Sequence, residues 1–299
     1  MRFGLFGTGP WAQMVHAPAL AAHDDVEFAG VWGRNETKAA DLADRYGAAA
    51  YPSIDALIAD VDAIAVALPP DVQAPIALQA ARAGRHLLLD KPIALDPELA
   101  AEIAAAVAER DLASVVFFTR QFQPVVRDFL DRIVATGGWL EGRVEYVDKI
   151  FRPGNPFGAS PWRQEKGGLW DIGPHAFAMA VRVLGPVAEV TAMVGAPDMS
   201  HVLARHETGA ISTLTLSLDA PPAAARQDAV FAGPAGVVRM PSESADAVNA
   251  FGHALDELIA TAAGKLRSHI DVRLGAHVTA VLAAVAEAAR TGRTVAVVG

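Results

Sequence analysis

The first 120 residues alternate short apolar runs with longer amphipathic segments, and this order restricts the fold more than any other feature. Such alternation predicts strands joined by helices, and near-continuous apolar strands predict a parallel sheet covered on both faces. The predicted strands are 2–6, 26–32, 63–68, 86–89 and 115–118. Helices are predicted from the Asn35 cap to Tyr46, over 71–83, and from Asp96-Pro97 onward.

A glycine loop follows the first predicted strand. It reads Gly7-Thr8-Gly9-Pro10-Trp11-Ala12 and opens a predicted helix. Gly7 would make the tight turn, Gly9 would let a pyrophosphate approach the backbone, and Ala12 takes the place of the third glycine. The N–H groups of the helix start would bind the phosphates. The alternative is an ordinary strand–helix turn, but the position after the first strand favours a dinucleotide site.

The end of the second strand bears on the choice of cofactor. It reads Trp32-Gly33-Arg34-Asn35 and lacks the acidic residue that usually binds the ribose 2′-hydroxyl of NAD. Arg34 can face a 2′-phosphate, and Gly33 leaves room for it, so the sequence favours NADP over NAD. Alternatively, Arg34 stacks on adenine as a solvated loop residue, which permits either cofactor.

After about residue 120 the pattern changes. A helix at 123–135 precedes strands, and two helices end the chain at 249–263 and 274–290. The clustered strands predict a mostly antiparallel sheet, so we expect a dinucleotide-binding Rossmann domain at 1–120 and a substrate-binding and oligomerisation α+β domain at 121–299. Residues 151–168 are rich in Pro and Gly and are predicted to form a loop that is either functional or mobile. The strands are predicted at 142–150, 187–194, 200–205, 210–218, 229–231 and 237–240.

Composition excludes several functions. The net charge of −9 and the absence of a Lys/Arg run argue against nucleic-acid binding. With no cysteine, disulfides, thiolate metal sites and cysteine nucleophiles are ruled out. No metal site is expected either, since the later histidines show no metal-like arrangement. We find no signal peptide or membrane span, and expect a cytoplasmic protein. The histidines in question are His201, His206, His253, His269 and His277.

Three further segments carry a family resemblance: 88–92 (Leu-Leu-Asp-Lys-Pro), Trp162-Arg163 with 167–175 (Gly-Gly-Leu-Trp-Asp-Ile-Gly-Pro-His), and 288–295. Together with the glycine loop they resemble the glucose–fructose oxidoreductase/inositol dehydrogenase/rhizopine catabolism (Gfo/Idh/MocA) family. The resemblance implies a Rossmann domain and a C-terminal domain whose open sheet often makes a homodimer or homotetramer. It also implies NAD(P)-dependent hydride transfer on a hydroxyl or carbonyl of a sugar, cyclitol or similar compound.

Candidate catalytic residues follow from the proton that must accompany a hydride. His175 is the expected proton donor or acceptor. Lys91 would stabilise negative charge on the substrate oxygen and lower the pKa of His175. Asp171, four residues before His175, would lie on the same helix face and bind a substrate hydroxyl or orient the pair. The alternatives are a core or surface histidine, a surface lysine, and an aspartate that only caps a helix.

Other residues are assigned through the resemblance. Leu68, Pro69 and Asp90 fall in segments implied to contact the cofactor. Arg120, from its place just after the last strand of the domain, is expected either to contact substrate or to form a structural salt bridge. Trp162 and Arg163 resemble a segment close to the cofactor, or else anchor a loop by packing.

The chain also departs from the family. Asp90 replaces the usual Glu, Gln73 stands where a His is usual, and Ala178 replaces an acid that often anchors hydroxyls. Ala178 leaves open a second hypothesis, a catalytically inactive dinucleotide-binding regulator or scaffold. An unrelated Rossmann enzyme would leave Lys91 and His175 unexplained.

Overall fold

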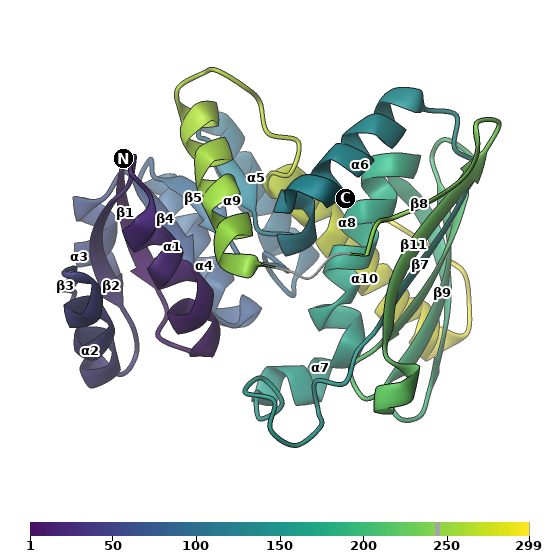
Figure 1. Cartoon of the computed structure of the whole chain (residues 1–299), viewed down its shortest axis with the longest axis horizontal. Helices are drawn as coiled ribbons and strands as arrows, with labels where there is room; N and C mark the ends of the chain where they lie inside the picture. Colours follow the sequence, from purple (N-terminus) through teal and green to yellow (C-terminus); the bar gives the residue numbers. More distant parts are fainter. Residues whose placement is uncertain (243–245, 299) are drawn as a thin grey trace. The chain divides into compact units, whose positions relative to one another are not determined.

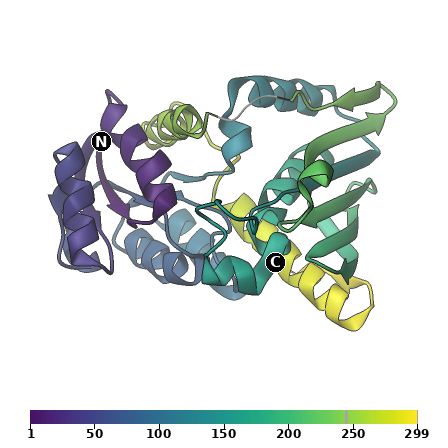
Figure 2. The ribbon, with the colours of Figure 1, turned by 60° about the horizontal axis from the view of Figure 1, so that its bottom comes forward.

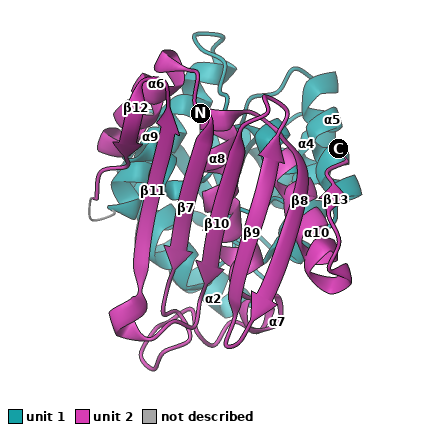
Figure 3. Cartoon of the chain, turned by 90° about the vertical axis from the view of Figure 1, so that its right-hand side faces the viewer, with its two compact units in different colours: residues 1–123, 245–276 teal, residues 124–244, 277–299 magenta. Residues whose placement is uncertain are grey.

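The computed structural model describes residues 1–242 and 246–298. The chain divides into two compact units: residues 1–123 with 245–276, and residues 124–244 with 277–299 (Figure 3). Unit 1 therefore contains a late segment that lies outside the expected domain of 1–120. Helix α9 (Ala247–Ala262) belongs to that segment, and the division falls inside α10 (Val272–Thr291), the yellow helix of Figure 2.

Unit 1 is built on a six-stranded parallel sheet with the strand order β3-β2-β1-β4-β5-β6 (Figure 1). This order is that of the dinucleotide-binding Rossmann fold, so the predicted fold class is confirmed. Its strands are β1 (Arg2–Phe6), β2 (Glu27–Trp32), β3 (Ala49–Ala50), β4 (Ala63–Val66), β5 (His86–Leu89) and β6 (Ser114–Val116). Strand β3 was not predicted, because its two alanines carry no strand pattern.

The helices of unit 1 begin and end at residues suited to those positions. The Asn35 side chain caps α2 by accepting from Lys38 N, and Gly47 closes that helix in the left-handed conformation. The Asp96 side chain caps α5 in the same way. Helix α3, also missed, starts at a Ser53 cap. The helices are α1 (Ala17–Ala22), α2 (Glu36–Tyr46), α3 (Ile54–Asp60), α4 (Pro70–Arg82) and α5 (Pro97–Glu109), with short η1 (Ala12–His16) and η2 (Thr119–Phe122).

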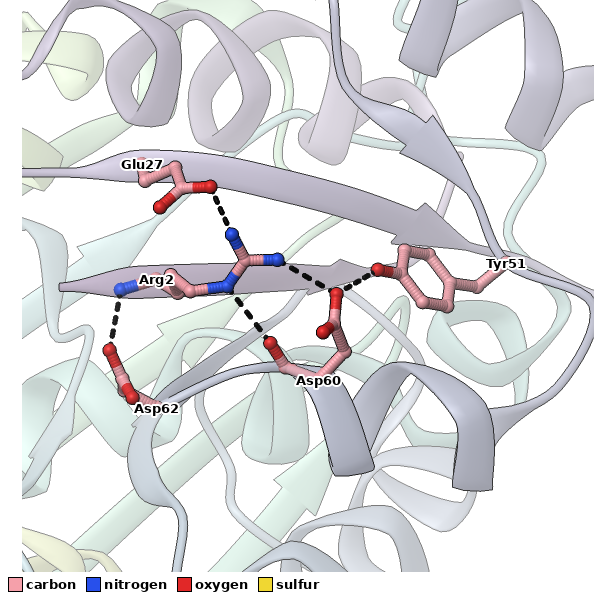
Figure 4. Close-up of polar contacts among 5 residues, drawn as sticks. All are labelled: Arg2, Glu27, Tyr51, Asp60 and Asp62. Carbon is pink, nitrogen blue, oxygen red and sulfur yellow. Dashed lines mark hydrogen bonds and ion pairs between the residues drawn. The ribbon is translucent and has the colours of Figure 1, made fainter.

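A polar cluster ties together the elements at the amino end of β1 (Figure 4). The Arg2 guanidinium contacts the carboxylates of Glu27 and Asp60, and Asp60 also accepts from the Tyr51 hydroxyl. The backbone N–H of Arg2 donates to Asp62 at 2.8 Å. Hydrogen bonds from Tyr51 and Arg2 lower the pKa of Asp60. Because β1 ends at Phe6, this cluster lies at the opposite end of the strand from the glycine loop.

Unit 2 is a seven-stranded sheet with helices on one face. Its order is β12-β11-β7-β10-β9-β8-β13, and only the β7–β10 pair is parallel, which confirms the mostly antiparallel prediction. Helices α7 and α8 pack on this sheet, and α6 packs on α8. The elements are α6 (Pro124–Thr136), β7 (Glu141–Val147), α7 (Pro161–Asp171), α8 (Gly173–Leu184), β8 (Val187–Gly195), β9 (Met199–His206), β10 (Ile211–Ser217), η3 (Pro222–Ala224), β11 (Arg226–Gly233), β12 (Gly236–Arg239) and β13 (Val295–Ala296).

Helices α7 and α10 differ from what the sequence predicted or bear on a possible membrane span. The predicted loop at 151–168 was wrong in its second half, because α7 begins at Pro161, a residue suited to a first helical turn. Within the described residues, α10 is the one helix long and apolar enough to meet the length and composition test for a membrane span. However, 56% of its most apolar window is buried inside the protein, as in a core helix.

Candidate functional site

The candidate residues of unit 1 all follow the carboxyl ends of its strands. Gly7 comes after β1, Gly33 after β2, Leu68 after β4, Asp90 after β5, and Arg120 lies in η2 after β6. Carboxyl ends of parallel strands meet at one edge of the sheet. Since β1 and β4 are neighbours and the strand order reverses there, the glycine loop lies at the switch point where such sheets bind ligands.

Gly7 is required by the protein itself, and Gly33 lies against the Thr8 side chain. Gly7 has φ of 127° and its N–H donates to Trp32 O at 2.9 Å. A Cβ on Gly7 would lie 2.4 Å from Ala67 O, and a Cβ on Gly33 would lie 2.7 Å from Thr8 Cγ2. A side chain at Gly7 would therefore displace the loop backbone, whereas one at Gly33 would press on the Thr8 side chain.

Gly9 is different, because neither its conformation nor its neighbours demand glycine. Its φ is not positive, and a Cβ built there meets nothing within 4 Å. The space beside Gly9 is thus left open by the protein, at the point where the sequence analysis expects a pyrophosphate. The residues present fit a dinucleotide.

The helix after this loop contains a π-helical turn. Residues Ala12–His16 form η1, which then continues as α1. The sequence predicted a regular helix there. The side chain of Gln13 donates to Thr8 O at 2.9 Å and so fastens the loop to the turn. Single π-turns inside helices occur frequently at functional sites.

Arg34 and Asn35 have different roles at the end of β2. The Asn35 side-chain oxygen accepts from Lys38 N at 2.9 Å, so it is used in capping α2. Arg34 is exposed, and no residue in the described ranges forms an ion pair with it. Its guanidinium is therefore available to an anionic ligand.

In unit 2, Arg163 and Asp171 form an ion pair inside α7. Arg163 Nε donates to Asp171 Oδ2 at 2.9 Å, and Asp171 is only 5% exposed. The guanidinium carbon also lies 4.8 Å from the Trp162 ring centroid and 5.4 Å from that of Phe157. The Trp162–Arg163 segment therefore orients the Asp171 carboxylate.

Asp171 and His175 lie on consecutive helices rather than on a single one. Asp171 is the last residue of α7, and His175 is in the first turn of α8. The N-cap of α8 is Ile172, the residue after Asp171, and it has no side-chain cap bond. The His175 ring stacks on Tyr146 of β7, with centroids 6.3 Å apart and an interplanar angle of 10°. Ala178, further along α8, is completely buried.

Asp198 is a residue of this region that the sequence analysis missed. It lies between β8 and β9, and its carboxylate accepts from Gly168 N at 3.0 Å and Leu218 N at 2.8 Å. Gly167, at φ of 64°, kinks α7 beside it, and a Cβ there would lie 2.2 Å from Asp198 Oδ1. Asp198 thus explains the double glycine and fixes the segment that leads to Asp171. Only the turn-like Pro197-Asp198 pair marks it in the sequence.

We expect Asp198→Ala to lower the free energy of unfolding by about 2–4 kcal/mol, because two backbone N–H groups lose their acceptor. Asp198→Asn keeps an acceptor and should cost far less. Burial raises the pKa of the Asp198 carboxyl. The extra proton that the folded state binds therefore adds stability that is fully present below about pH 4 and is lost as pH rises through the folded-state pKa, while the two backbone hydrogen bonds persist at higher pH. Urea unfolding at several pH values would measure both effects, and equal losses for the two variants would contradict them.

No group of three or more His, Asp or Glu residues in the described part of the chain could hold a metal ion.

Comparison with known proteins gives a consistent family. The model for an oxidoreductase family with an NAD-binding Rossmann fold (GFO_IDH_MocA) matches residues 1–118, and that for the GFO/IDH/MocA C-terminal domain matches residues 136–239.

Among curated relatives, the chain is 34% identical over 127 residues to the UDP-N-acetylglucosamine 3-dehydrogenase of Acidithiobacillus ferrooxidans, covering 42% of this chain and 40% of the relative. It is 31% identical over 193 residues to the inositol 2-dehydrogenase of Rhizobium meliloti, covering 62% and 55%. These alignments span about half the length of the relatives. The WlbA dehydrogenase from Bordetella pertussis, solved with NADH and UDP-GlcNAcA, has the same fold, with a TM-score of 0.86 at 22% identity over 100% of this chain and 98% of that one.

Proposed function

Because the chain belongs to the Gfo/Idh/MocA family of oxidoreductases, we propose that it is an NAD(P)-dependent dehydrogenase or reductase. Its substrate would be a small hydroxy or oxo compound of the sugar or cyclitol class. The observation that carries this proposal is Gly9, which leaves open space at the switch point of a Rossmann sheet although nothing in the protein requires glycine there. The names of the relatives support the substrate class.

The residues have distinct roles in this proposal. Bound nicotinamide supplies a hydride acceptor or donor. The loop from Gly7 to Ala12 holds the pyrophosphate, with Leu68, Pro69, Asp90, Trp162 and Arg163 assigned to the cofactor's surroundings.

When the substrate is oxidised, His175 would take the hydroxyl proton while the hydride leaves the same carbinol for the oxidised nicotinamide; in reduction, His175 would return the proton. Lys91 stabilises the substrate oxygen. Asp171, oriented by Arg163, accepts a hydrogen bond from a substrate hydroxyl, and Arg120 adds a further substrate contact.

The function can be tested with the purified chain. Fluorescence titration with NADH and NADPH measures cofactor binding. Turnover of myo-inositol and UDP-N-acetylglucosamine with oxidised cofactor, and of the matching ketones with reduced cofactor, measures the chemistry. A protein that binds neither dinucleotide would contradict the proposal.

NADP is the proposed cofactor of the two, on the basis of Arg34. We expect Arg34→Asp to weaken NADPH binding by at least about 10-fold, since a carboxylate would replace the partner of the 2′-phosphate. NADH binding should be unchanged or tighter, because an acid can bind the 2′-hydroxyl. Titrations of Arg34→Asp and of the original chain with NADPH and with NADH test this expectation. Lys38→Asp, on the adjoining helix, is the charge-matched control. Equal NADPH affinity in Arg34→Asp and the original chain would refute the assignment.

The proposal also includes assembly of a homodimer or homotetramer in the cytoplasm through the sheet of unit 2. The outward face of this sheet carries none of the described α-helices of the unit (Figure 3). Strand register places Leu203 and Met193 on that face together with Ile211 and Thr213. Two charged neighbours, Arg205 and Glu189, already pair with each other. The same face of a second copy of the chain would pack against it, because both faces have the same mixture of apolar and Thr side chains.

A further inference from the structure

Gln73 holds the peptide groups on both sides of Lys91. It lies in the first turn of α4 and is completely buried. Its Oε1 accepts from Asp90 N at 3.0 Å, while its Nε2 donates to Asp90 O at 2.7 Å and to Pro92 O at 3.0 Å. The Gln73 amide thereby makes the backbone hydrogen bonds that a neighbouring strand would make with the segment that follows β5.

Only an amide provides this combination of contacts. A primary amide carries both a donor and an acceptor, and both are used here, so the cost of burying Gln73 is offset by hydrogen bonds. Helix α4 places the residue accurately, because Gln73 N donates to Pro69 O at 2.8 Å and α4 packs beside β5. The arrangement removes freedom from a segment that could otherwise move as a loop.

The side chain of Asp90 is fixed from the other direction. Its Oδ1 accepts from Lys91 N at 3.1 Å, and its Oδ2 lies 3.4 Å from His16 Nε2. His16 is the last residue of η1 and is completely buried, with its ring centroid 4.2 Å from that of Phe251. The residue before Lys91 is therefore held through its backbone by Gln73, and its carboxylate faces the helix that starts at the glycine loop.

We propose that Gln73 is a positioning residue for Lys91, which it serves by fixing the backbone of Asp90 and Pro92 from α4. This inference rests on the proposed function, in which Lys91 stabilises the substrate oxygen. A misplacement of about 1 Å in a catalytic group can cost on the order of 100-fold in rate. Gln73 touches neither substrate nor cofactor in this role, and acts only through the segment that carries Lys91.

The first test is independent of activity and uses three variants of the full chain. Gln73→Leu removes all of the amide's hydrogen bonds. Gln73→Glu keeps the shape and an acceptor but puts an oxygen against the carbonyls of Asp90 and Pro92, which provides a second variant if the leucine chain does not fold. Gln79→Leu makes the same change at an exposed position of α4 and is the control.

Hydrogen exchange of the peptide that contains Asp90, Lys91 and Ile93 should accelerate by at least about 10-fold in either Gln73 variant, as expected for a local opening that has lost its hydrogen bonds. Gln79→Leu should exchange like the original chain. NADH affinity, measured by titration, should stay within about twofold in Gln79→Leu. Unchanged exchange in the Gln73 variants would overturn the inference.

The second test is a double-mutant cycle on turnover of the sugar and cyclitol panel. Gln73→Leu should lower kcat by about 10-fold to 100-fold with little change in KM, and should have no further effect once Lys91→Ala is present. Additive losses would indicate a general structural role and overturn the inference. If Lys91→Ala loses turnover while Gln73→Leu keeps it, only this inference fails. If both keep it, the proposed role of Lys91 fails as well.

Discussion

Replacing His175 or Lys91 by alanine is expected to lower kcat by about 100-fold to 10,000-fold while NADH and NADPH still bind. The physical reason is that, in the proposed mechanism, the two changes remove the proton acceptor and the charge that stabilises the substrate oxygen, and both leave the glycine loop intact. His175 lies in unit 2, at the start of α8 against Tyr146, so its loss does not disturb the sheet that binds the dinucleotide. Lys91 follows β5 at the carboxyl edge of that sheet.

Matched controls separate chemistry from stability in this experiment. His201 is exposed on β9 and contacts the Thr215 hydroxyl at 3.3 Å, so His201→Ala should keep full turnover. Lys265, exposed after α9, is the corresponding control for Lys91. Each variant should be titrated with NADH and NADPH, and its urea unfolding curve should be measured at one temperature. Full activity of both His175→Ala and Lys91→Ala on an established substrate would require different catalytic groups.

Gly7→Ala and Gly9→Ala should fail for different reasons, although they lie two residues apart. At Gly7 a methyl group meets the Ala67 carbonyl at 2.4 Å, and φ of 127° is strained for any L-residue. We expect a loss of at least about 3 kcal/mol in the free energy of unfolding, or no folded protein. At Gly9 a methyl group meets no protein atom, so Gly9→Ala should unfold like the original chain but bind NADH and NADPH at least about 10-fold more weakly.

Urea unfolding and cofactor titration of the two variants together test the dinucleotide site. Gly47→Ala is a further comparison, since Gly47 has φ of 67° and open space around it, and it should lose stability without losing cofactor affinity. A Gly9→Ala chain that binds cofactor normally would show that the pyrophosphate does not approach this backbone.

Most of unit 1 could be predicted because its evidence is local. The strand runs, the caps at Asn35 and Asp96, and the glycine after the first strand each depend on a few neighbouring residues. Elements without such evidence were missed or misplaced. Strand β3 is two alanines, and the early part of α7 lies in a Gly- and Pro-rich segment. The identity of the candidate residues also came from the sequence, through segments such as 88–92 and 167–175.

The sequence by itself determined how most strands and helices alternate along the chain, and thus that Gly9 and Lys91 each follow the carboxyl end of a strand. Only the tertiary structure decided what holds those residues in place. Gln73 and Asp90 are 17 residues apart, and Asp198 and Gly168 are 30 apart, with nothing local to pair them. A buried amide or carboxylate acquires its partners only when packing excludes water, and those partners depend on strand order and register that no short segment specifies.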